Sequence, residues 1–464
     1  PHISGRAGRR PAGEKGGEAA HPRPRQRATD PHPPAGTLWK LGVPPPQKQG
    51  RLARGKVFLY NKKDGQCLAR RREKKIAEKG GFSMNYRPFG KTGVQVSALG
   101  FGCMRLPTVD QVPLSGAIDE KTAIQMIRRG IDRGINYVDT AYNYHKDNSE
   151  ILVGKALRDG YREKVFLATK SPVYSFKAPE DFERVLDHQL EKLQTDHIDF
   201  YLLHNLTADY WQRAKEFDLL AKLDKARAAG KIRFMGFSFH DQVDLFREIV
   251  DSHHWDFCQI QLNYAQTHYQ AGLEGLEYAA AKGLGVVIME PLMGGKLAHP
   301  SQHIADALPD NSRSPVEWAL DYLWNRPEVS LVLSGMSTPQ QVEETVDCAA
   351  RSSVGMLTKE QVEAVEGAGE LFQRQSLVPC TGCAYCMPCP FGLDIPRIYE
   401  LYNRTGSQGV EKADGDYRAL TVRADSCKAC GACEKICPQH IPSRQLVPAV
   451  HKLFADYEKE AAQG

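Results

Sequence analysis

The chain has 464 residues, enough for about three domains, and its charged (25%) and hydrophobic (41%) residues are present in the proportions of an ordinary globular protein. Much of the small net charge of +5 comes from the first 75 residues, so no basic surface for nucleic acid is expected in the remainder. There is no apolar stretch of about 20 residues and no secretory segment, which argues against a membrane protein and indicates the cytoplasm.

Residues 1–83 are rich in Pro, Gly and Arg and show no helical or strand period, so we expect them to be disordered. The run Lys79-Gly80-Gly81 can be encoded by a purine-rich ribosome-binding sequence shortly before Met84. We therefore expect that Met84 is the native start and that residues 1–83 are a translated leader. The alternative is a genuine basic tail.

From residue 84 the pattern changes to apolar strands that alternate with amphipathic helices, after a short hairpin pattern over Tyr86–Val96. Eight strands are predicted, near Ser97–Gly102, Asn136–Asp139, Lys164–Lys170, Ile198–His204, Ile232–Ser238, Phe257–Asn263, Gly285–Glu290 and Ser330–Ser334. Helices are predicted between them, among them Glu120–Arg133, Ala178–Leu193, Lys215–Ala229, Ala271–Lys282 and Thr338–Ala350. This count and length predict an α/β fold, a (β/α)8 TIM barrel over residues 84–356.

A further helix is predicted over Leu357–Gln375, because Thr358 can cap its N-terminus and Gln361 follows three residues later. We expect residues 357–375 to link the barrel to a small α-rich domain over residues 376–464. Within that domain, helices are expected at Ile398–Tyr402 and over Gln445–Glu460.

Four residue types with complementary chemistry end successive barrel strands, where TIM barrels carry their active sites. They are Asp139 and Tyr144 at and after the second strand, Lys170 at the third and His204 at the fourth. In carbonyl reduction the oxygen becomes an alkoxide that must be protonated, and a tyrosine assisted by lysine can do this. An aspartate would hold the lysine, and a neutral histidine would orient the carbonyl. Isolated residues of these types are usually structural, but their joint placement predicts a catalytic group.

The motifs Asp-Thr-Ala-x-x-Tyr at 139–144, Thr-Lys at 169–170 and Leu-Leu-His at 202–204 resemble the catalytic motifs of the aldo/keto reductase superfamily. This resemblance implies an NAD(P)H-dependent oxidoreductase that reduces a small aldehyde or ketone. It also implies that Ser238 and Gln259 contact the nicotinamide carboxamide. The residues implied along the pyrophosphate and adenosine are Leu292, Gly335, Gln341 and Glu344. Unlike many members, the chain has no Lys or Arg at Gly335, Met336 or Gln341 for a 2'-phosphate, which makes NADH a candidate beside NADPH.

Eight of the twelve cysteines form two runs that each end in Cys-Pro. The runs are Cys380, Cys383, Cys386 and Cys389, followed by Cys427, Cys430, Cys433 and Cys437. The second has the C-x2-C-x2-C-x3-C-P spacing of bacterial two-cluster ferredoxins, in which the fourth cysteine serves the other cluster. We therefore expect a ferredoxin-like domain with two [4Fe-4S] clusters in a reducing compartment.

Crossed ligation assigns Cys380, Cys383, Cys386 and Cys437 to one cluster and Cys427, Cys430, Cys433 and Cys389 to the other. The first run has one residue fewer before its fourth cysteine, which weakens the assignment of Cys389. Zinc is the alternative metal. Among the other cysteines, Cys258 lies in an apolar strand and is expected to be core packing.

The whole chain from Met84 resembles ferredoxin-fused aldo/keto reductases of anaerobes. Hydride carries two electrons and a cluster carries one, so three roles stay open for the clusters: a structural appendage, delivery of electrons to a flavin or substrate, or docking of a partner ferredoxin. The alternative functions are a cluster-driven reductase with a flavin in the barrel and a nucleotide-responsive redox sensor. Neither nucleic acid nor a membrane is an expected partner.

Overall fold

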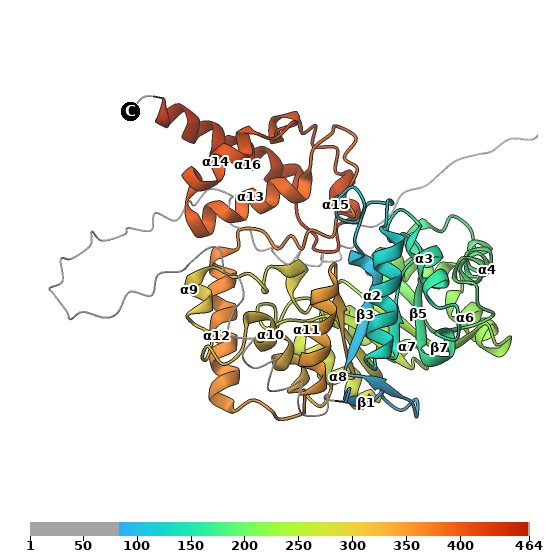
Figure 1. Ribbon diagram of the computed structural model, residues 1–464. Coiled ribbons are helices and arrows are strands. Elements are labelled where there is room, and N and C mark those ends of the chain that lie inside the picture. The colour runs from blue at the N-terminus through green and yellow to red at the C-terminus, as the bar shows by residue number, and fades with distance from the viewer. Residues whose placement is uncertain (1–82, 463–464) are drawn as a thin grey trace, which may run out of the picture. The chain divides into compact units, whose positions relative to one another are not determined.

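A closed barrel of eight parallel strands forms the body of the computed structural model, which describes residues 83–462 (Figure 1). The predictions for residues 1–82 lie outside the described residues. The strands are β3 (Leu99–Gly102), β4 (Tyr137–Asp139), β5 (Phe166–Ser171), β6 (Ile198–Leu206), β7 (Ile232–Phe239), β8 (Phe257–Gln261), β9 (Gly285–Met289) and β10 (Leu331–Gly335). They follow one another around the barrel in chain order, and β10 closes it against β3. All eight strands were expected, and the TIM barrel is confirmed.

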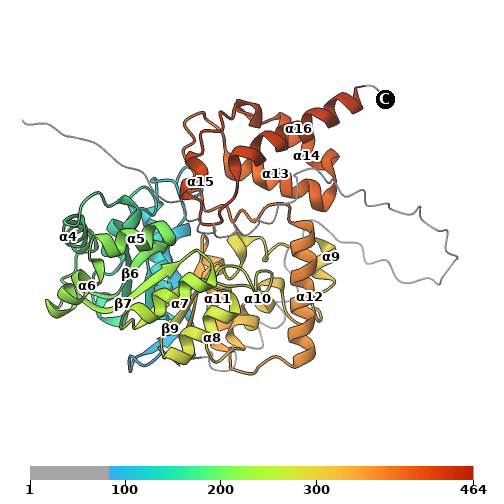
Figure 2. The ribbon, with the colours of Figure 1, turned by 180° about the vertical axis from the view of Figure 1, so that it is seen from behind.

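These strands are continuous apolar runs because helices cover their outer side. All nine residues of β6 are buried, for example. The helices that connect the strands are α2 (Glu120–Asp132), α3 (Ser149–Ala156), α4 (Asp181–Leu193), α5 (Ala208–Glu216), α6 (Leu219–Ala228), α7 (Val243–Ser252), α8 (Gly272–Lys282), α9 (Gln302–Ala305), α10 (Pro315–Trp324) and α11 (Pro339–Ala350). Figures 1 and 2 show them around the barrel from opposite sides.

The single helix predicted over Lys215–Ala229 is wrong, because α5 ends and α6 begins within that range. Asp218 separates the two helices with a backbone φ of 52°. This left-handed conformation cannot continue a right-handed helix, and Asp adopts it more readily than most residues. The apolar spacing continues across the break, which is why the pattern alone did not reveal it.

A hairpin of β1 (Tyr86–Pro88) and β2 (Gln95–Ser97) precedes the barrel, where the sequence predicted one. Phe89, in its loop, is fully buried, and its ring lies 4.7 Å from that of Phe200 and 5.8 Å from that of Phe257, measured between centroids. Gly285 must lack a side chain here, because a Cβ would approach the Phe89 ring to 2.6 Å. The hairpin therefore packs against the barrel interior at the end opposite the catalytic motifs.

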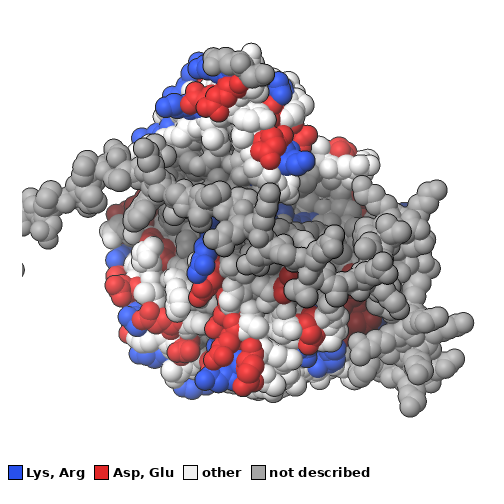
Figure 3. Space-filling model, turned by 90° about the vertical axis from the view of Figure 1, so that its left-hand side faces the viewer, with Lys and Arg blue, Asp and Glu red and all other residues white. Residues whose placement is uncertain are grey.

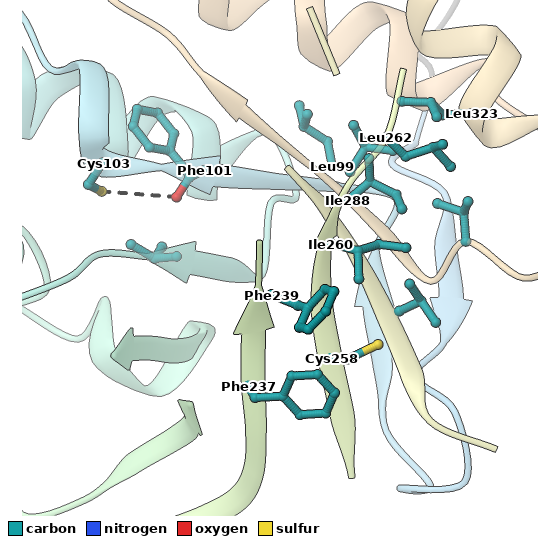
Figure 4. Close-up of a cluster of buried hydrophobic side chains, with 14 of the residues drawn as sticks. Leu99, Phe101, Cys103, Phe237, Phe239, Cys258, Ile260, Leu262, Ile288 and Leu323 are labelled. Atoms are coloured by element: carbon teal, nitrogen blue, oxygen red, sulfur yellow. Dashed lines mark hydrogen bonds between the residues drawn. The ribbon is translucent and has the colours of Figure 1, made fainter. Parts of the chain in front are cut away.

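Between the strands and the outer helices lies the largest apolar core (Figure 4). Phe237, Phe239, Cys258 and Ile260 contribute to it from β7 and β8, and all four side chains are fully buried. Cys258 is thus a core residue, as expected. Cys103 is also buried there, with its sulfur 4.0 Å from the Phe101 carbonyl oxygen.

Helix α12 (Lys359–Gln375) follows the barrel and begins with the expected capping box, in which the side chains of Thr358 and Gln361 each bind the other's backbone N–H. Its buried residues Val365, Ala368 and Phe372 belong to the barrel's apolar core. Gly369 allows the close approach, since a Cβ there would lie 2.2 Å from a backbone oxygen of Tyr264. The helix therefore packs on the barrel along its length and ends just before the first cysteine run.

The C-terminal residues form a helical domain with its own apolar core. Its helices are α13 (Ile395–Gln408), α14 (Val410–Arg418), α15 (Ala432–Ile436) and α16 (Ser443–Ala461). Helix α13 is longer than the predicted Ile398–Tyr402, whereas α16 matches the predicted Gln445–Glu460 closely. In this second core the rings of Tyr417 and Phe454 stack at 4.0 Å between centroids. Figures 1 and 2 place this domain over one end of the barrel.

The surface carries mixed charge. On the face in Figure 3, acidic and basic side chains lie interspersed among neutral residues. Ion pairs such as Lys155 with Glu120, at 2.7 Å, and Lys222 with Glu183, at 2.8 Å, join neighbouring helices. Within residues 83–462, none of the helices combines the length and the apolar character needed to cross a membrane.

Candidate active site

The predicted catalytic side chains meet in one cavity of about 630 Å³ at the carboxyl ends of the strands. Strand register explains why. Asp139 on β4 pairs with Ala168 on β5, and Lys170 lies two residues after Ala168 on that strand. Lys170 in turn pairs with Leu202 on β6, and His204 lies two residues after Leu202. Since side chains of a strand return to the same face every second residue, this stagger aims successive groups into the same opening.

Lys170 and Asp139 form a buried ion pair, with the ammonium 2.6 Å from Oδ1 of Asp139. The ammonium also donates to the Thr140 carbonyl oxygen at 2.7 Å. Burial lowers the pKa of Lys170 and raises that of Asp139, and their mutual attraction opposes both shifts. The position of the Lys170 ammonium is thus fixed by the Asp139 carboxylate, by the Thr140 carbonyl oxygen and by burial of the side chain.

Tyr144 lies beside this pair, with the Lys170 ammonium 4.8 Å from the centre of its ring. Burial raises the pKa of the Tyr144 phenol well above its ordinary value, the negative charge of Asp139 adds to the rise, and a hydrogen bond with Tyr385 opposes it. The phenol therefore holds its proton, which suits a proton donor better than a base.

His204 completes the group, with its ring centre 6.1 Å from that of Tyr144. Burial lowers the pKa of the imidazole well below its ordinary value, and the charge of Lys170 lowers it further. The imidazole is therefore neutral near pH 7. Its Nε2 atom lies 3.4 Å from the Tyr385 hydroxyl, while Nδ1 has no hydrogen-bond partner within the described residues.

Two polar side chains, Ser238 and Gln259, lie on the next strands. The Ser238 hydroxyl oxygen accepts a hydrogen bond from the Asn205 backbone N–H at 2.7 Å, so its own hydrogen is free to donate into the cavity. Gln259 is 3% exposed, and its Oε1 atom has no partner among residues 83–462. A buried acceptor without a partner is costly, so it indicates a missing donor. A donor beside an acceptor fits a carboxamide such as that of nicotinamide.

The cavity continues over the ends of β9 and β10, where it is lined by the other residues expected at the cofactor: Leu292, Gly335, Gln341 and Glu344. The Gln341 side chain accepts a hydrogen bond from the Ser337 backbone N–H at 2.7 Å and so shapes the turn before α11. Arg105, which sequence reasoning missed, also lines the cavity. A Cβ at Gly335 would contact the Arg105 side chain at 3.3 Å, and Arg105 lies 4.0 Å from Glu290.

The cysteine-rich domain supplies one wall of this cavity. The residues involved are Thr381, Cys383, Tyr385, Pro438 and Gln439. Lys296 donates to the Cys380 carbonyl oxygen at 2.6 Å, and Gln270 donates to that of Pro438 at 2.8 Å. The His440 ring nitrogen and the His240 carbonyl oxygen lie 2.6 Å apart. Both cysteine runs are thereby tied to the barrel mouth.

The eight cysteines line two adjacent hollows and are free of disulfide bonds. One hollow contains Cys380, Cys383, Cys386 and Cys437, and the other contains Cys389, Cys427, Cys430 and Cys433. Each hollow also touches one cysteine of the other set, Cys433 in the first and Cys386 in the second. The fourth cysteine of each run thus lies with the first three of the other run, as crossed ligation requires.

Comparison with known proteins agrees with this architecture. Residues 98–370 match the model of the aldo/keto reductase family, and residues 379–441 match that of the 4Fe-4S dicluster domain. The chain is 31% identical over 306 residues to L-galactose dehydrogenase of Arabidopsis thaliana, a match that covers 60% of this chain and 93% of the relative. It is 25% identical over 334 residues to the NADH-specific methylglyoxal reductase of Escherichia coli, covering 60% and 98%.

Among solved structures, an aldo-keto reductase from Bacillus halodurans in its holo form superposes with a TM-score of 0.52 at 26% identity, covering 61% of this chain and 96% of that one. A TIM barrel with this site defines an oxidoreductase, and the chain belongs to the aldo/keto reductase family. It is an aldo/keto reductase that carries a C-terminal 4Fe-4S dicluster domain, as the sequence predicted.

Proposed function

We propose that this protein reduces a small aldehyde or ketone to an alcohol with NAD(P)H, and that Tyr144 is the proton donor. The observation that carries the proposal is the convergence of Tyr144, Lys170, Asp139 and His204 in the cavity that also contains Ser238 and Gln259. A group for the reacting oxygen and a group for the nicotinamide would then lie in one opening.

A bound nicotinamide would supply the hydride. The neutral imidazole of His204 donates from Nε2 to the carbonyl oxygen and orients it. The Tyr144 phenol, which keeps its proton because of burial, transfers it to that oxygen as negative charge develops there. The buried ammonium of Lys170 stabilises the phenolate that remains, and Asp139 holds the ammonium in place.

Ser238 and Gln259 would hold the carboxamide by one donor and one acceptor. Leu292, Gly335, Gln341 and Glu344 would follow the pyrophosphate and adenosine. Neither Gly335 nor Gln341 carries a charge for a 2'-phosphate, and the similar E. coli protein is named as NADH-specific. These observations favour NADH over NADPH.

The two hollows in the C-terminal domain would hold the [4Fe-4S] clusters with crossed ligands. The C-x2-C-x2-C-x3-C-P spacing of the second run and the crossed grouping of the cysteines favour clusters over zinc. Cys430 is exposed, so an electron carrier such as ferredoxin could approach the second cluster.

The test is anaerobic purification followed by iron and sulfide analysis and by NADH and NADPH oxidation with a panel of small aldehydes. We expect about eight irons per chain, aldehyde-dependent oxidation of NADH and loss of that activity in Tyr144→Phe. Stoichiometric zinc would contradict the clusters. Flavin in the spectrum of the denatured protein would favour the cluster-driven alternative, and a Tyr144→Phe variant with normal activity would contradict the proposed proton donor.

A further inference from the structure

The hydroxyl of Tyr385 lies between the two groups that would bind the substrate oxygen. It is 3.4 Å from His204 Nε2, and it lies close enough to the Tyr144 phenol for each group to shift the pKa of the other. A carbonyl oxygen poised for reduction must contact these same two groups. One oxygen atom already holds that position in the free site, and it comes from the cysteine-rich domain.

The backbone around Tyr385 is held on both sides. Cys383 and Cys386 flank it and line the first hollow, while Arg105 donates to the Thr381 carbonyl oxygen at 3.2 Å. Gly294 lets this loop come close, because a Cβ there would lie 2.0 Å from the Thr381 carbonyl oxygen. The loop is thus anchored to the barrel mouth by backbone contacts that do not involve the Tyr385 side chain.

The Tyr385 ring also has space to move into. It borders both the active-site cavity and the hollow that contains Tyr174, Tyr210 and Cys427. Tyr385 as a whole residue is partly exposed, in contrast to Tyr144 and His204, which are 8% and 4% exposed. Because Tyr385 borders a second hollow, rotation about its own side-chain bonds would move the hydroxyl away from His204 without unfolding the loop.

We propose that Tyr385 occupies the carbonyl-oxygen position of the free enzyme and that a carbonyl substrate binds by displacing its hydroxyl. Tyr385 is then a specificity-determining residue supplied by the cluster-binding loop. Substrates whose oxygen bonds strongly to Tyr144 and His204 displace it, and weak acceptors do not. This inference rests on the proposed carbonyl reductase function. It adds that each substrate must displace the Tyr385 hydroxyl in order to bind.

The test uses isobutyramide, a small amide whose carbonyl accepts hydrogen bonds but is not reduced by hydride. Its dissociation constant is measured by calorimetry on the iron-replete enzyme saturated with NADH, for the native protein and for Tyr385→Phe. Removing the competing hydroxyl removes a hydrogen bond of ordinary strength, so the dissociation constant should fall about 3- to 10-fold. The KM for a reactive aldehyde should fall similarly.

The matched control is Tyr174→Phe. Its ring also lies edge-on to His204, at 5.7 Å, but Tyr174 does not line the active-site cavity. The amide affinity of this variant should equal that of the native protein, and iron analysis should give the same content for all three proteins.

An unchanged or larger dissociation constant in Tyr385→Phe overturns the inference, and a larger one would mean that Tyr385 donates to the bound carbonyl. The amide could bind more tightly to Tyr385→Phe although the enzyme oxidises neither NADH nor NADPH. This result would support the displacement of Tyr385 and overturn the reductase function. Failure of the amide to bind to either protein would overturn both.

Discussion

The Lys170 ammonium lies 2.6 Å from the Asp139 carboxylate, and the two residues are 1% and 2% exposed. The ion pair is buried, so each charge depends on the other. The pair also determines where the proposed proton donor can lie, since the Tyr144 ring packs against the ammonium.

Lys170→Met should therefore lower both stability and activity. The substitution leaves the Asp139 carboxylate buried without its partner, which typically costs about 3–5 kcal/mol in the free energy of unfolding. Thermal and denaturant unfolding of the variant measure this loss. Lys155→Met is the control, because it breaks an exposed pair with Glu120 and should change stability little. Equal stability of the two variants would refute the role given to the buried pair.

Hydride transfer should be independent of pH between the ordinary pKa values of histidine and tyrosine, 6.5 and 10.0. Burial raises the pKa of Tyr144, so the donor stays protonated as the pH rises through this range. Burial lowers the pKa of His204, so the imidazole stays neutral as the pH falls through it. Single-turnover NADH oxidation with an aldehyde measures the rate. A midpoint inside the range would contradict this expectation, because it would show that one of the two groups titrates there.

Crossed ligation predicts which cysteine variants resemble one another. Cys437→Ser should perturb the same cluster as Cys383→Ser, although Cys437 belongs to the second run. Cys389→Ser should perturb the same cluster as Cys427→Ser. Electron paramagnetic resonance of the dithionite-reduced proteins gives the signal of the remaining cluster. If Cys437→Ser resembled Cys427→Ser instead, each run would ligate its own cluster.

Gln341→Arg should shift the preference toward NADPH. An arginine at this position would face the cavity and bind a 2'-phosphate, and a hydrogen bond to a charged group contributes about 1.5–3 kcal/mol. The ratio of the NADPH to NADH dissociation constants should fall about tenfold or more, as measured by fluorescence titration. Gln340→Arg is the matched control, since this neighbour pairs with Glu344 and does not line the cavity. The same shift in both variants would indicate a general effect of charge.

The barrel and its proposed catalytic residues could be predicted because the sequence patterns that indicate them lie within short segments of the chain. Apolar runs of strand length alternate with helical periods, and each predicted catalytic residue lies at or just after a strand, where the barrel fold gathers them. Cysteine spacing likewise predicted the dicluster domain. Asp139, Tyr144, Lys170 and His204 could thus be located without coordinates.

Tyr385 could not be found in this way, because its contact with His204 joins residues 181 positions apart and on different domains. An aromatic residue between two cysteines gives no sign of where its ring points. Arg105 was missed for a similar reason, since its partners Glu290 and Thr381 come from a distant strand end and from the cysteine loop. The contacts of Tyr385 with His204 and of Arg105 with Thr381 form only where the cysteine-rich domain docks on the barrel.

The two domains have separate apolar cores, yet residues of both enclose one cavity. The thiolates that would bind iron flank the stretch of chain that forms this enclosure. We therefore expect that removal of the iron would loosen this stretch of chain and open the cavity to water on one side, so that the proposed reduction would depend on the supply of iron.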